Sequence, residues 1–544
     1  MPWNRLNGHT FAAAEVFSSG AEVFVLRRFP ALALSVAALL ITSTTATADP
    51  PDPLAEFHAQ PVKWAPCGGT LSELECATLV APLDYAAPAG DRIKLMISRR
   101  KAAAQDRRRG VLFTNPGGPG GSGVGVPQFL ANSELAQVYD LIGFDPRGVG
   151  GSTALNCRAA PAIAELDSRP ADAEFGKWAA EAREAEEACQ RSSGGIRQFI
   201  STANTARDMD VVRTVLGEPK INYLGYSYGT YLGAVYGTLF PKRLDRSVLD
   251  SAVHPEWIWR EQLRQQAVAY RQDVDTWATW VGQRNEKFAL GKSQAEVLAE
   301  VEKVAAKLNT TPIGEYNRSS FDGAMGVGAR YRPLWSDLAA IVTKLRSGEK
   351  PENAEGAKAG QVLARTSLQE LRSGVFDTVT CESAWPTDLH NYYEDMRTFR
   401  ERYPYGFGVV RAAPMTCTFR SFTPPEEAVK IGRNGYPVGV VVQSEGDTQT
   451  QYASGPAMAA RLGHNLITVV DEGKHSIYHG GNPCVDGKVN RYLIDGVLPG
   501  SSSECAGDPR PDVPKDGQAG AAPALSADRI QTYLDGRGLS AGRP

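Results

Sequence analysis

Short apolar segments alternate with amphipathic segments between residues 110 and 253. The apolar segments have the length and composition of buried strands, and the stretches between them repeat apolar residues at helical spacing. The strand-like segments are residues 111–114, 141–144, 221–224 and 247–249. Because strands that alternate with helices pair through helical crossovers, this block predicts a mostly parallel sheet and the fold class α/β.

The same alternation returns late in the chain, where strand-like residues 438–442 and 466–470 flank a helix-like stretch. Between the two blocks, helical patterns dominate. Ser293 and Glu296, for example, form a capping box that starts a helix with one apolar face. We therefore predict that the middle of the chain forms a cap, or lid, over the sheet. The predicted map is a core in two parts at 49–253 and 431–505, a mainly helical cap at 254–430 and a C-terminal tail at 506–544.

Residues 1–48 have the three-part layout of a signal peptide. Arg27 and Arg28 precede an uncharged apolar run at 31–41, and a small-residue cleavage site ends at Ala48. At roughly 1.5 Å per residue, the apolar run is too short for a bilayer of about 30 Å, which argues against the alternative of an N-terminal anchor helix. We predict cleavage after Ala48, a secreted or cell-envelope location and no stable membrane span.

Composition narrows the function classes further. The 58 Lys and Arg residues nearly balance the 61 Asp and Glu residues, so the net charge is only −3. Nucleic-acid binding usually needs a basic field, and we therefore expect no nucleic-acid partner. A hydrophobic fraction of 42% over 544 residues indicates a sizeable buried core instead.

The eight cysteines contain no Cys-x-x-Cys pair and no Cys/His cluster at zinc spacing. We therefore predict no metal site and four disulfides formed in an oxidising compartment, with buried free thiols as the alternative. Eight cysteines allow many connectivities, and sequence alone does not select one. Sequential pairing keeps each loop within one segment of the map: Cys67 with Cys76, Cys157 with Cys189, Cys381 with Cys417 and Cys484 with Cys505.

One Gly-x-Ser-x-Gly sequence occurs, at residues 225–229. The bare motif is weak evidence in a chain with 54 glycines, but a strand pattern precedes it and a helix pattern follows it. A tight turn from strand to helix lifts a serine hydroxyl clear of the sheet and places the next backbone N–H at a helix N-terminus, where negative charge is stabilised. We predict Ser227 as a nucleophile and the Tyr228 N–H as an oxyanion donor.

A serine nucleophile needs a base that takes its proton and an acid that orients the base. In folds with this turn, the chain order is serine, acid, histidine. His475 lies on the loop after the strand at 466–470, at the carboxyl edge of the sheet where such sites form. We predict His475 as the base, with His479 as the second candidate.

The acid should lie on the corresponding loop of the preceding strand. Asp447 follows the strand at 438–442 and is the predicted acid. Glu445, two residues earlier, and Asp250, at the end of the strand before the cap, are the alternatives. Asp250 also fits a purely structural role as a hydrogen-bond acceptor.

The glycine-rich residues 115–123 follow the first strand of the early block. Few side chains intervene there, so backbone N–H groups can converge and supply a second oxyanion donor. The same stretch has the glycine spacing of a dinucleotide-binding fingerprint, with Asp145 at the end of the next strand. Pro119 and Pro127 interrupt the turn and the helix that would hold a pyrophosphate, so we predict an oxyanion loop and no cofactor.

A family resemblance is carried by the stretches at 115–123, 144–150 and 225–229, with Asp447 and His475. These motifs resemble the secreted tripeptidyl aminopeptidases and their proline-iminopeptidase-like relatives in the α/β-hydrolase superfamily. The resemblance covers roughly residues 60–505. It implies an eight-stranded, mostly parallel sheet, a helical cap inserted after the sixth strand, and removal of short peptides from free amino ends.

The resemblance also implies roles by position: Ser227 as nucleophile, Asp447 as acid, His475 as base, and Gly118 with Tyr228 as the oxyanion hole. The chain departs from the family pattern in three places. Pro116 stands where iminopeptidases have histidine, Gln451 where a proline is common, and Lys474 where glycine is common. These departures leave the triad intact.

An enzyme that acts at free amino ends needs an anion to hold the ammonium group of the substrate. Glu382, in the predicted cap, is a candidate for that role, and a structural or solvated carboxylate is the alternative. We predict an exported serine hydrolase that forms an acyl-enzyme on Ser227 and acts on peptides as a tripeptidyl aminopeptidase. A carboxylesterase or lipase with the same triad and a non-catalytic binding protein on this scaffold are the alternatives, because a fold does not fix a reaction.

Overall fold

The computed structural model describes residues 52–157, 167–351 and 374–518. The predicted signal peptide at 1–48 lies outside the described residues, as does the tail beyond residue 518. Within the described residues, no helix has the length and apolar character that crossing a membrane requires.

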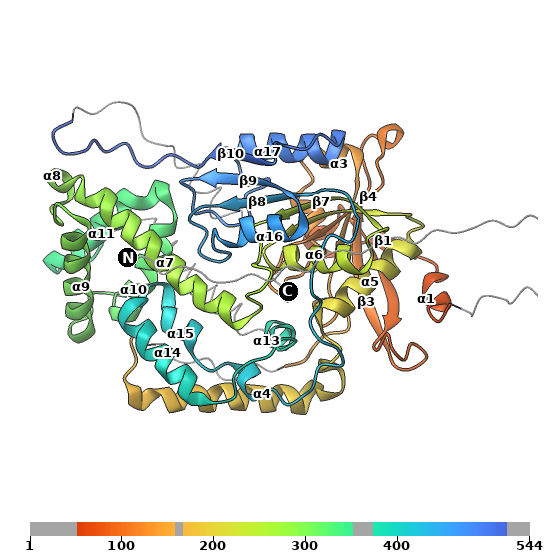
Figure 1. The fold of residues 1–544 in the computed structure, drawn as a ribbon, viewed down its shortest axis with the longest axis horizontal. Coiled ribbons are helices and arrows are strands. Elements are labelled where there is room, and N and C mark those ends of the chain that lie inside the picture. Colours follow the sequence, from red (N-terminus) through yellow and green to blue (C-terminus); the bar gives the residue numbers. More distant parts are fainter. Residues whose placement is uncertain (1–51, 158–166, 352–373, 519–544) are drawn as a thin grey trace, which may run out of the picture. The chain divides into compact units, whose positions relative to one another are not determined.

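One ten-stranded sheet forms the centre of the core (Figure 1). Its strands are β1 (Ala65–Pro66), β2 (Glu75–Pro82), β3 (Arg92–Arg100), β4 (Val111–Asn115), β5 (Asp140–Phe144), β6 (Ile221–Tyr226), β7 (Leu244–Asp250), β8 (Val440–Ser444), β9 (Asn465–Val470) and β10 (Ser502–Ala506). The spatial order is β1-β2-β3-β5-β4-β6-β7-β8-β9-β10. All neighbours from β5 to β10 pair in parallel, and β1, β2 and β3 pair antiparallel.

This arrangement confirms the predicted α/β-hydrolase fold and adds two edge strands. β2 to β9 are the eight expected strands, and β1 and β10 extend the sheet at its two ends. β10 has the polar sequence Ser-Ser-Glu-Cys-Ala, which no apolar pattern marks as a strand. It pairs with β9, and a disulfide from Cys505 to Cys484 holds it against α17 (Pro483–Asn490).

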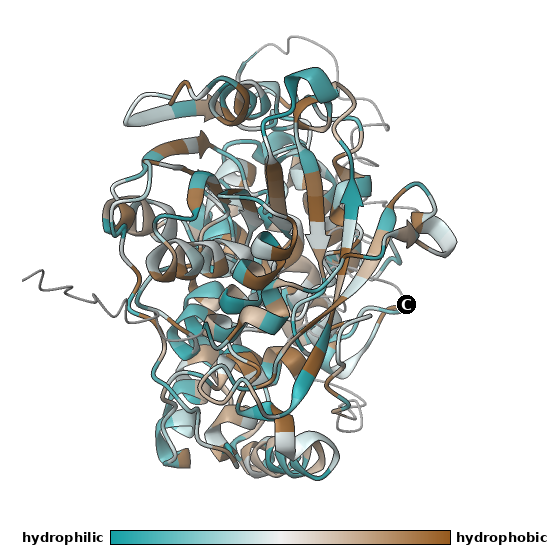
Figure 2. Cartoon of the chain, turned by 90° about the vertical axis from the view of Figure 1, so that its right-hand side faces the viewer, coloured by the Kyte–Doolittle hydropathy of each residue, from teal (hydrophilic) through white to brown (hydrophobic). Residues whose placement is uncertain are grey.

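Helices cover both faces of the sheet. One face packs against α5 (Thr202–Val215), α6 (Tyr228–Leu239) and α16 (Ser454–Leu462). The other packs against α2 (Val126–Phe129), α3 (Leu135–Val138) and α17. β4, β5, β6 and β8 are therefore buried at every position, and Figure 2 shows apolar residues concentrated along the central strands.

Between β7 and β8, the described residues contain helices and no strand. The helices are α7 (Arg260–Gly282), α8 (Asn285–Phe288), α9 (Gln294–Thr310), α10 (Arg318–Arg330), α11 (Trp335–Ser347), α13 (Gly374–Thr380), α14 (Leu389–Arg402) and α15 (Gly408–Ala412). They have an apolar core of their own around Trp277, Trp280 and Trp335. The predicted cap after the sixth of the eight strands is thus confirmed. The Ser293 hydroxyl caps α9 as predicted, but Glu296 accepts the N–H of Lys292 instead of that of Ser293, so only half of the predicted capping box forms.

A second segment of chain also packs with the cap. α4 (Phe175–Arg197) follows β5, yet its surroundings belong to the cap helices (Figure 1). Arg169, just before α4, pairs with Asp322 of α10 at 2.8 Å, and Glu186 of α4 accepts the Ser421 N–H at 2.8 Å. The sequence map placed this segment in the first core part, because residue patterns do not reveal long-range contacts. The other boundaries of the map stay a prediction.

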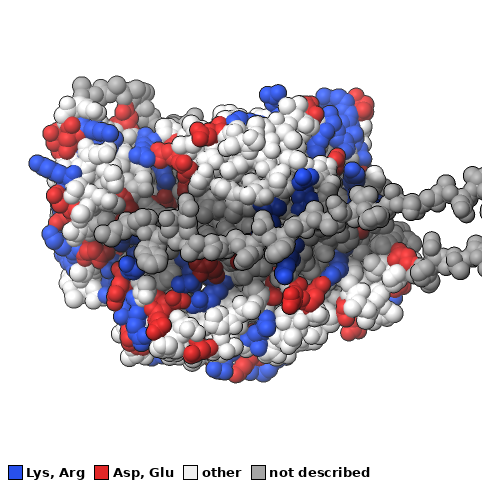
Figure 3. Space-filling model, viewed as in Figure 1, with Lys and Arg blue, Asp and Glu red and all other residues white. Residues whose placement is uncertain are grey.

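The four predicted disulfides are confirmed, with the sequential pairing. They join Cys67 with Cys76, Cys157 with Cys189, Cys381 with Cys417 and Cys484 with Cys505. All eight cysteines are thereby paired. Acidic and basic side chains are interspersed over most of the face in Figure 3, in agreement with the nearly balanced charge of the sequence.

Candidate active site

Ser227 lies on the turn between β6 and α6 and has a positive φ of 56°. A side chain in this region of φ is strained, and such strain is typical of a nucleophile held out on a sharp turn. The neighbouring glycines are required by space. A Cβ on Gly225 would overlap the carbonyl oxygen of Gly229, and a Cβ on Gly229 would lie 2.9 Å from the carbonyl oxygen of Asn115.

The predicted acid and base are hydrogen-bonded to each other. His475 Nδ1 lies 2.7 Å from Asp447 Oδ2, and Asp447 is only 1% exposed. The Asp447 carboxylate also accepts the Gln449 N–H at 2.8 Å and the Thr450 hydroxyl at 2.8 Å. Sequence reasoning missed Thr450, although its spacing of three residues from Asp447 on a turn was a usable signal. These contacts fix the carboxylate in the orientation that an imidazole partner needs.

The surroundings of Asp447 favour its ionised form. Burial raises the pKa of Asp447, but His475 and the buried Arg330 lower it by more, so the pKa lies below its ordinary value. An ionised Asp447 holds the ring of His475 through Nδ1. Nε2 is then the ring nitrogen that remains to act as a base.

Asp250 connects the serine turn to the histidine loop. Its backbone carbonyl accepts the Ser227 N–H at 2.9 Å. Its carboxylate, fully buried, accepts the N–H groups of Ile477 at 2.9 Å and Tyr478 at 2.6 Å. One residue therefore holds Ser227 and the loop of His475 at the same edge of the sheet. The described residues form no hydrogen bond between Ser227 and His475, so the proton-transfer contact stays a prediction.

The alternative acids have other partners. Asp250 has the structural role that the sequence left open, and burial raises its pKa to about 6 despite its backbone N–H donors. Glu445 is exposed and accepts the backbone N–H of Asp471 at 2.8 Å. Among the three candidates, Asp447 is the one that is hydrogen-bonded to the imidazole of His475.

The other histidines after Ser227 lack such a carboxylate partner on a core loop. The ring of His479 packs edge-on against Phe129 at a centroid distance of 5.0 Å. His464 Nδ1 accepts the Gly439 N–H at 3.1 Å, and burial lowers the pKa of His464 to about 3. His254 stacks on Trp257, and His390 is exposed beside Glu394 of its own helix.

The glycine-rich loop after β4 lies against the serine turn. A Cβ on Gly117 would lie 2.7 Å from the Cβ of Ser227 and 3.3 Å from the backbone nitrogen of Tyr228. The Gly117 N–H donates to Asn115 Oδ1 at 3.0 Å. Among the described residues, the N–H groups of Gly118 and Tyr228 have no acceptor. Both stay predicted oxyanion donors.

The carboxylate of Asp145, which would hold a ribose in the dinucleotide alternative, accepts hydrogen bonds from neighbouring loop residues. It accepts the Ser122 hydroxyl at 2.6 Å and the N–H groups of Gly123 at 3.1 Å and Gly151 at 2.8 Å. It therefore ties the glycine-rich loop to the end of β5. Within residues 52–157, 167–351 and 374–518, no group of three or more His, Cys, Asp or Glu residues has the arrangement of a metal site.

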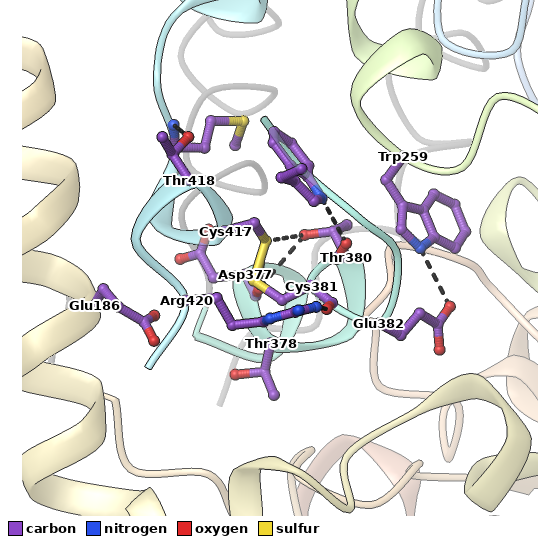
Figure 4. The surroundings of a disulfide bond; sticks show 12 residues. Glu186, Trp259, Asp377, Thr378, Thr380, Cys381, Glu382, Cys417, Thr418 and Arg420 are labelled. Carbon is purple, nitrogen blue, oxygen red and sulfur yellow. Dashed lines mark hydrogen bonds between the residues drawn. A yellow bond between two sulfur atoms is a disulfide. The ribbon is translucent and has the colours of Figure 1, made fainter. Parts of the chain in front are cut away.

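Glu382 lies in the cap, directly after the cysteine of a disulfide (Figure 4). Its carboxylate accepts the N–H and the hydroxyl of Thr202, both at 2.8 Å, and the indole N–H of Trp259 at 3.2 Å. The Thr202 hydroxyl also lies 2.9 Å from the hydroxyl of Tyr228, the residue after the nucleophile. Burial raises the pKa of Glu382 to about 7, against the effect of these donors. The predicted amino-end anchor is thus connected to the serine turn through two side chains.

The parallel sheet, the serine on a strand-to-helix turn and the carboxylate–imidazole pair together define a hydrolase of the α/β fold. In agreement, residues 110–345 match the family described as alpha/beta hydrolase fold, and residues 403–505 match the family described as TAP-like protein.

Three relatives illustrate the similarity. The tripeptidyl aminopeptidase of Streptomyces lividans is 33% identical over 476 residues, which cover 83% of this chain and 88% of the relative. The serine protease Hip1 of Mycobacterium tuberculosis is 29% identical over 82% of this chain and 91% of its own length. The carboxylesterase B of the same species is 31% identical over 79% and 86%. The chain belongs to the tripeptidyl aminopeptidase-like family of α/β hydrolases and is a serine peptidase.

Proposed function

We propose that this serine peptidase forms an acyl-enzyme on Ser227 and releases short peptides, of tripeptidyl type, from free amino ends. The observation that carries the proposal is the hydrogen bond of 2.7 Å between His475 and the buried Asp447. Asp250 ties the loop that carries His475 to the serine turn. The arrangement supports the proposed roles of Asp447 and His475.

The proposed reaction has two steps. The Ser227 hydroxyl attacks the scissile carbonyl carbon while His475 Nε2 takes the hydroxyl proton, and Asp447 stabilises the resulting imidazolium. The backbone N–H groups of Gly118 and Tyr228 stabilise the negative charge on the tetrahedral intermediate. His475 then protonates the leaving amine, and water hydrolyses the acyl-enzyme by the same route in reverse.

Glu382 is the proposed anchor for the substrate's ammonium group. Its carboxylate is buried close to Tyr228, and three donors leave part of its acceptor capacity free. A hydrogen bond between charged groups is worth roughly 1.5–3 kcal/mol, which corresponds to about 10- to 100-fold preference for a free over an acetylated amino end.

Export to a secreted or cell-envelope location is also proposed. It is supported by the signal-peptide layout of residues 1–48 and by four disulfides, which persist mainly in oxidising compartments. The proposed partners are peptide substrates.

An esterase is the second candidate function, because one relative is named a carboxylesterase and shares this fold. A panel of tripeptide anilides, with free and acetylated amino ends, beside nitrophenyl esters decides between the two. Turnover of free-ended anilides supports the aminopeptidase, whereas turnover of esters alone supports the esterase.

A serine-directed fluorophosphonate probe tests the nucleophile. We expect Ser227→Ala to abolish labelling and to lower turnover by a factor on the order of 10⁶, while the exposed control Ser347→Ala labels as the wild type does. Labelling of Ser227→Ala at the wild-type rate would contradict the assignment.

A further inference from the structure

One short cap segment, residues 330–332 at the end of α10, contacts both core loops that carry the proposed acid and base. Gly473 lies two residues before His475, and Gly446 lies directly before Asp447. Each of these glycines packs against an arginine of the cap segment. Both loops therefore pack directly against the cap.

The contact with the histidine loop is made by Arg330. This arginine is 3% exposed, and its Nε–H donates to the carbonyl oxygen of Gly473 at 2.6 Å. A Cβ on Gly473 would overlap the carbonyl oxygen of Arg330 and lie 3.0 Å from its Cγ. The loop can approach the cap this closely only because residue 473 has no side chain.

The contact with the acid loop is made by Arg332. Its guanidinium pairs with the buried Asp273 of α7 at 3.0 Å and also donates to the carbonyl oxygen of Arg330 at 3.0 Å. A Cβ on Gly446 would overlap this guanidinium and lie 2.8 Å from Asp273 Oδ1. The two arginines thus form one connected unit that touches both loops.

Arg330 also places a buried positive charge near Asp447, and this charge is one of the causes that lower the pKa of the carboxyl group. Other charged or titratable groups face the same region from the elements packed around it: Tyr270 and Asp273 of α7, Tyr331 and Arg332 after α10, Asp250 of β7, and Glu445, Asp471, Glu472 and Lys474 on the two loops. Of these groups, Arg330 is the buried cap side chain that donates to the backbone of the histidine loop, while Arg332 pairs with the Asp471 side chain at 3.4 Å and Asp250 holds the same loop from β7.

We infer that Arg330 is a positioning residue, which holds the histidine loop through Gly473 and keeps the proposed Asp447–His475 pair in its active charge state. The inference rests on the proposed roles of Asp447 and His475. It gives the cap a part in the chemical step, in addition to covering the substrate.

Two substitutions separate the two effects of Arg330. Arg330→Met removes both the charge and the Nε–H donor, so we expect kcat for a free-ended tripeptide anilide to fall about 10- to 100-fold with KM within about twofold. Without the buried cation the pair takes up a proton more readily, so the acid limb of the kcat/KM profile moves to higher pH. Arg330→Lys keeps the charge, so the acid limb stays at its wild-type position while kcat is still reduced.

Arg169→Met is the matched control. Arg169 packs with the cap and pairs with the buried Asp322, and its hydrogen bonds and ion pairs involve neither loop. We expect it to lower the melting temperature and to leave the pH profile unchanged. The inference is overturned if Arg330→Met keeps the wild-type kcat and pH profile, or if its profile matches that of Arg169→Met. If Arg330→Met does not fold, Arg330→Lys with wild-type kcat overturns it equally.

Labelling by the fluorophosphonate probe distinguishes this outcome from failure of the proposed function. When the wild type is labelled at Ser227 and the profiles are unchanged, only the role of Arg330 is wrong. When the wild type is not labelled at Ser227, the proposed triad itself is wrong.

Discussion

Removal of the Asp250 carboxylate is expected to detach the histidine loop from the sheet. This side chain is fully buried and accepts two backbone N–H groups, from Ile477 and Tyr478, while the backbone of Asp250 holds Ser227. Asp250→Ala leaves the backbone contact to Ser227 in place and removes the acceptor for the loop and for the Ser251 hydroxyl, which itself accepts the Ser476 N–H of that loop. The substitution therefore tests the link between the two halves of the proposed site.

The magnitude follows from the two hydrogen bonds. A hydrogen bond to a charged group is worth about 1.5–3 kcal/mol, so losing both in Asp250→Ala costs roughly 3–6 kcal/mol of unfolding free energy. That is a large share of a typical stability of about 5–15 kcal/mol. In Asp250→Asn the amide oxygen keeps one acceptor and the amide N–H₂ faces the other donor, so we expect about half the loss. Displacement of His475 by about 1 Å would lower kcat on the order of 100-fold.

Urea unfolding followed by tryptophan fluorescence measures the stability, and initial rates with a tripeptide anilide measure kcat. Asp245→Ala, at the other end of β7, is the matched control and is expected to behave like the wild type within about 0.5 kcal/mol. An Asp250→Ala protein with wild-type stability and wild-type kcat would refute the reasoning, because two buried N–H groups would then have lost their acceptor without effect.

Three further predictions concern the pH dependence and the cap. Burial raises the pKa of Glu382 to about 7, so the carboxylate that would bind the ammonium group forms as pH rises through 7. We therefore expect KM for free-ended peptides to fall over this range and Glu382→Gln to abolish that fall. A wild-type KM that does not change with pH would contradict the role of Glu382 as anchor. Burial lowers the pKa of His464 to about 3, so the contribution of neutral His464 to the free energy of unfolding is fully present above about pH 6.5 and is lost as pH falls. Urea unfolding should show a loss of about 3 kcal/mol at pH 4, and His464→Asn should flatten this pH dependence. An equal slope in both proteins would contradict the role of His464. Replacing Cys381 and Cys417 by serine should lower the free energy of unfolding by about 3–4 kcal/mol, because the disulfide joins residues 36 positions apart. It should also raise KM for free-ended peptides more than KM for acetylated peptides, whereas the Cys67/Cys76 double variant should leave the ratio of the two KM values unchanged. Thermal unfolding and KM measurements check both expectations.

Six strands of the core, β4 to β9, could be predicted because most of their positions are buried, whereas the residue pattern did not mark the partly exposed β2 and β3. β4, β6 and β9 stand out as apolar runs that need no knowledge of their neighbours. β10 could not be predicted in this way, because its stability comes from pairing with β9 and from a disulfide rather than from apolar side chains. The packing of α4 against the cap was missed for a related reason, since Glu186 of α4 and Arg169 before it contact Ser421 and Asp322, which lie far along the chain.

In the candidate site, too, local sequence patterns predicted some residues and not others. Ser227, Asp447 and His475 could be named as candidates because each follows a strand pattern at the expected edge of the sheet, and the structure brings Asp447 and His475 into hydrogen-bond contact. The residues that support them were not, because their partners are distant in sequence and their own types are common. Asp250 meets Ile477 after 227 positions, and Arg330 meets Gly473 after 143. No local pattern encodes such pairs.

The double origin of the cap has a consequence for recombination between relatives. A chimera that exchanged only residues 254–430 would bring a foreign partner to α4, which would remain from the original chain. The buried Glu186, now bonded to Arg197 and to Ser421, would keep its arginine, and its hydroxyl donor would depend on the foreign residue at position 421. Arg169 would keep its two acidic partners only where the foreign cap also has acids at the positions of Asp322 and Glu302. An exchange that preserves these buried contacts therefore moves both stretches of chain as a unit.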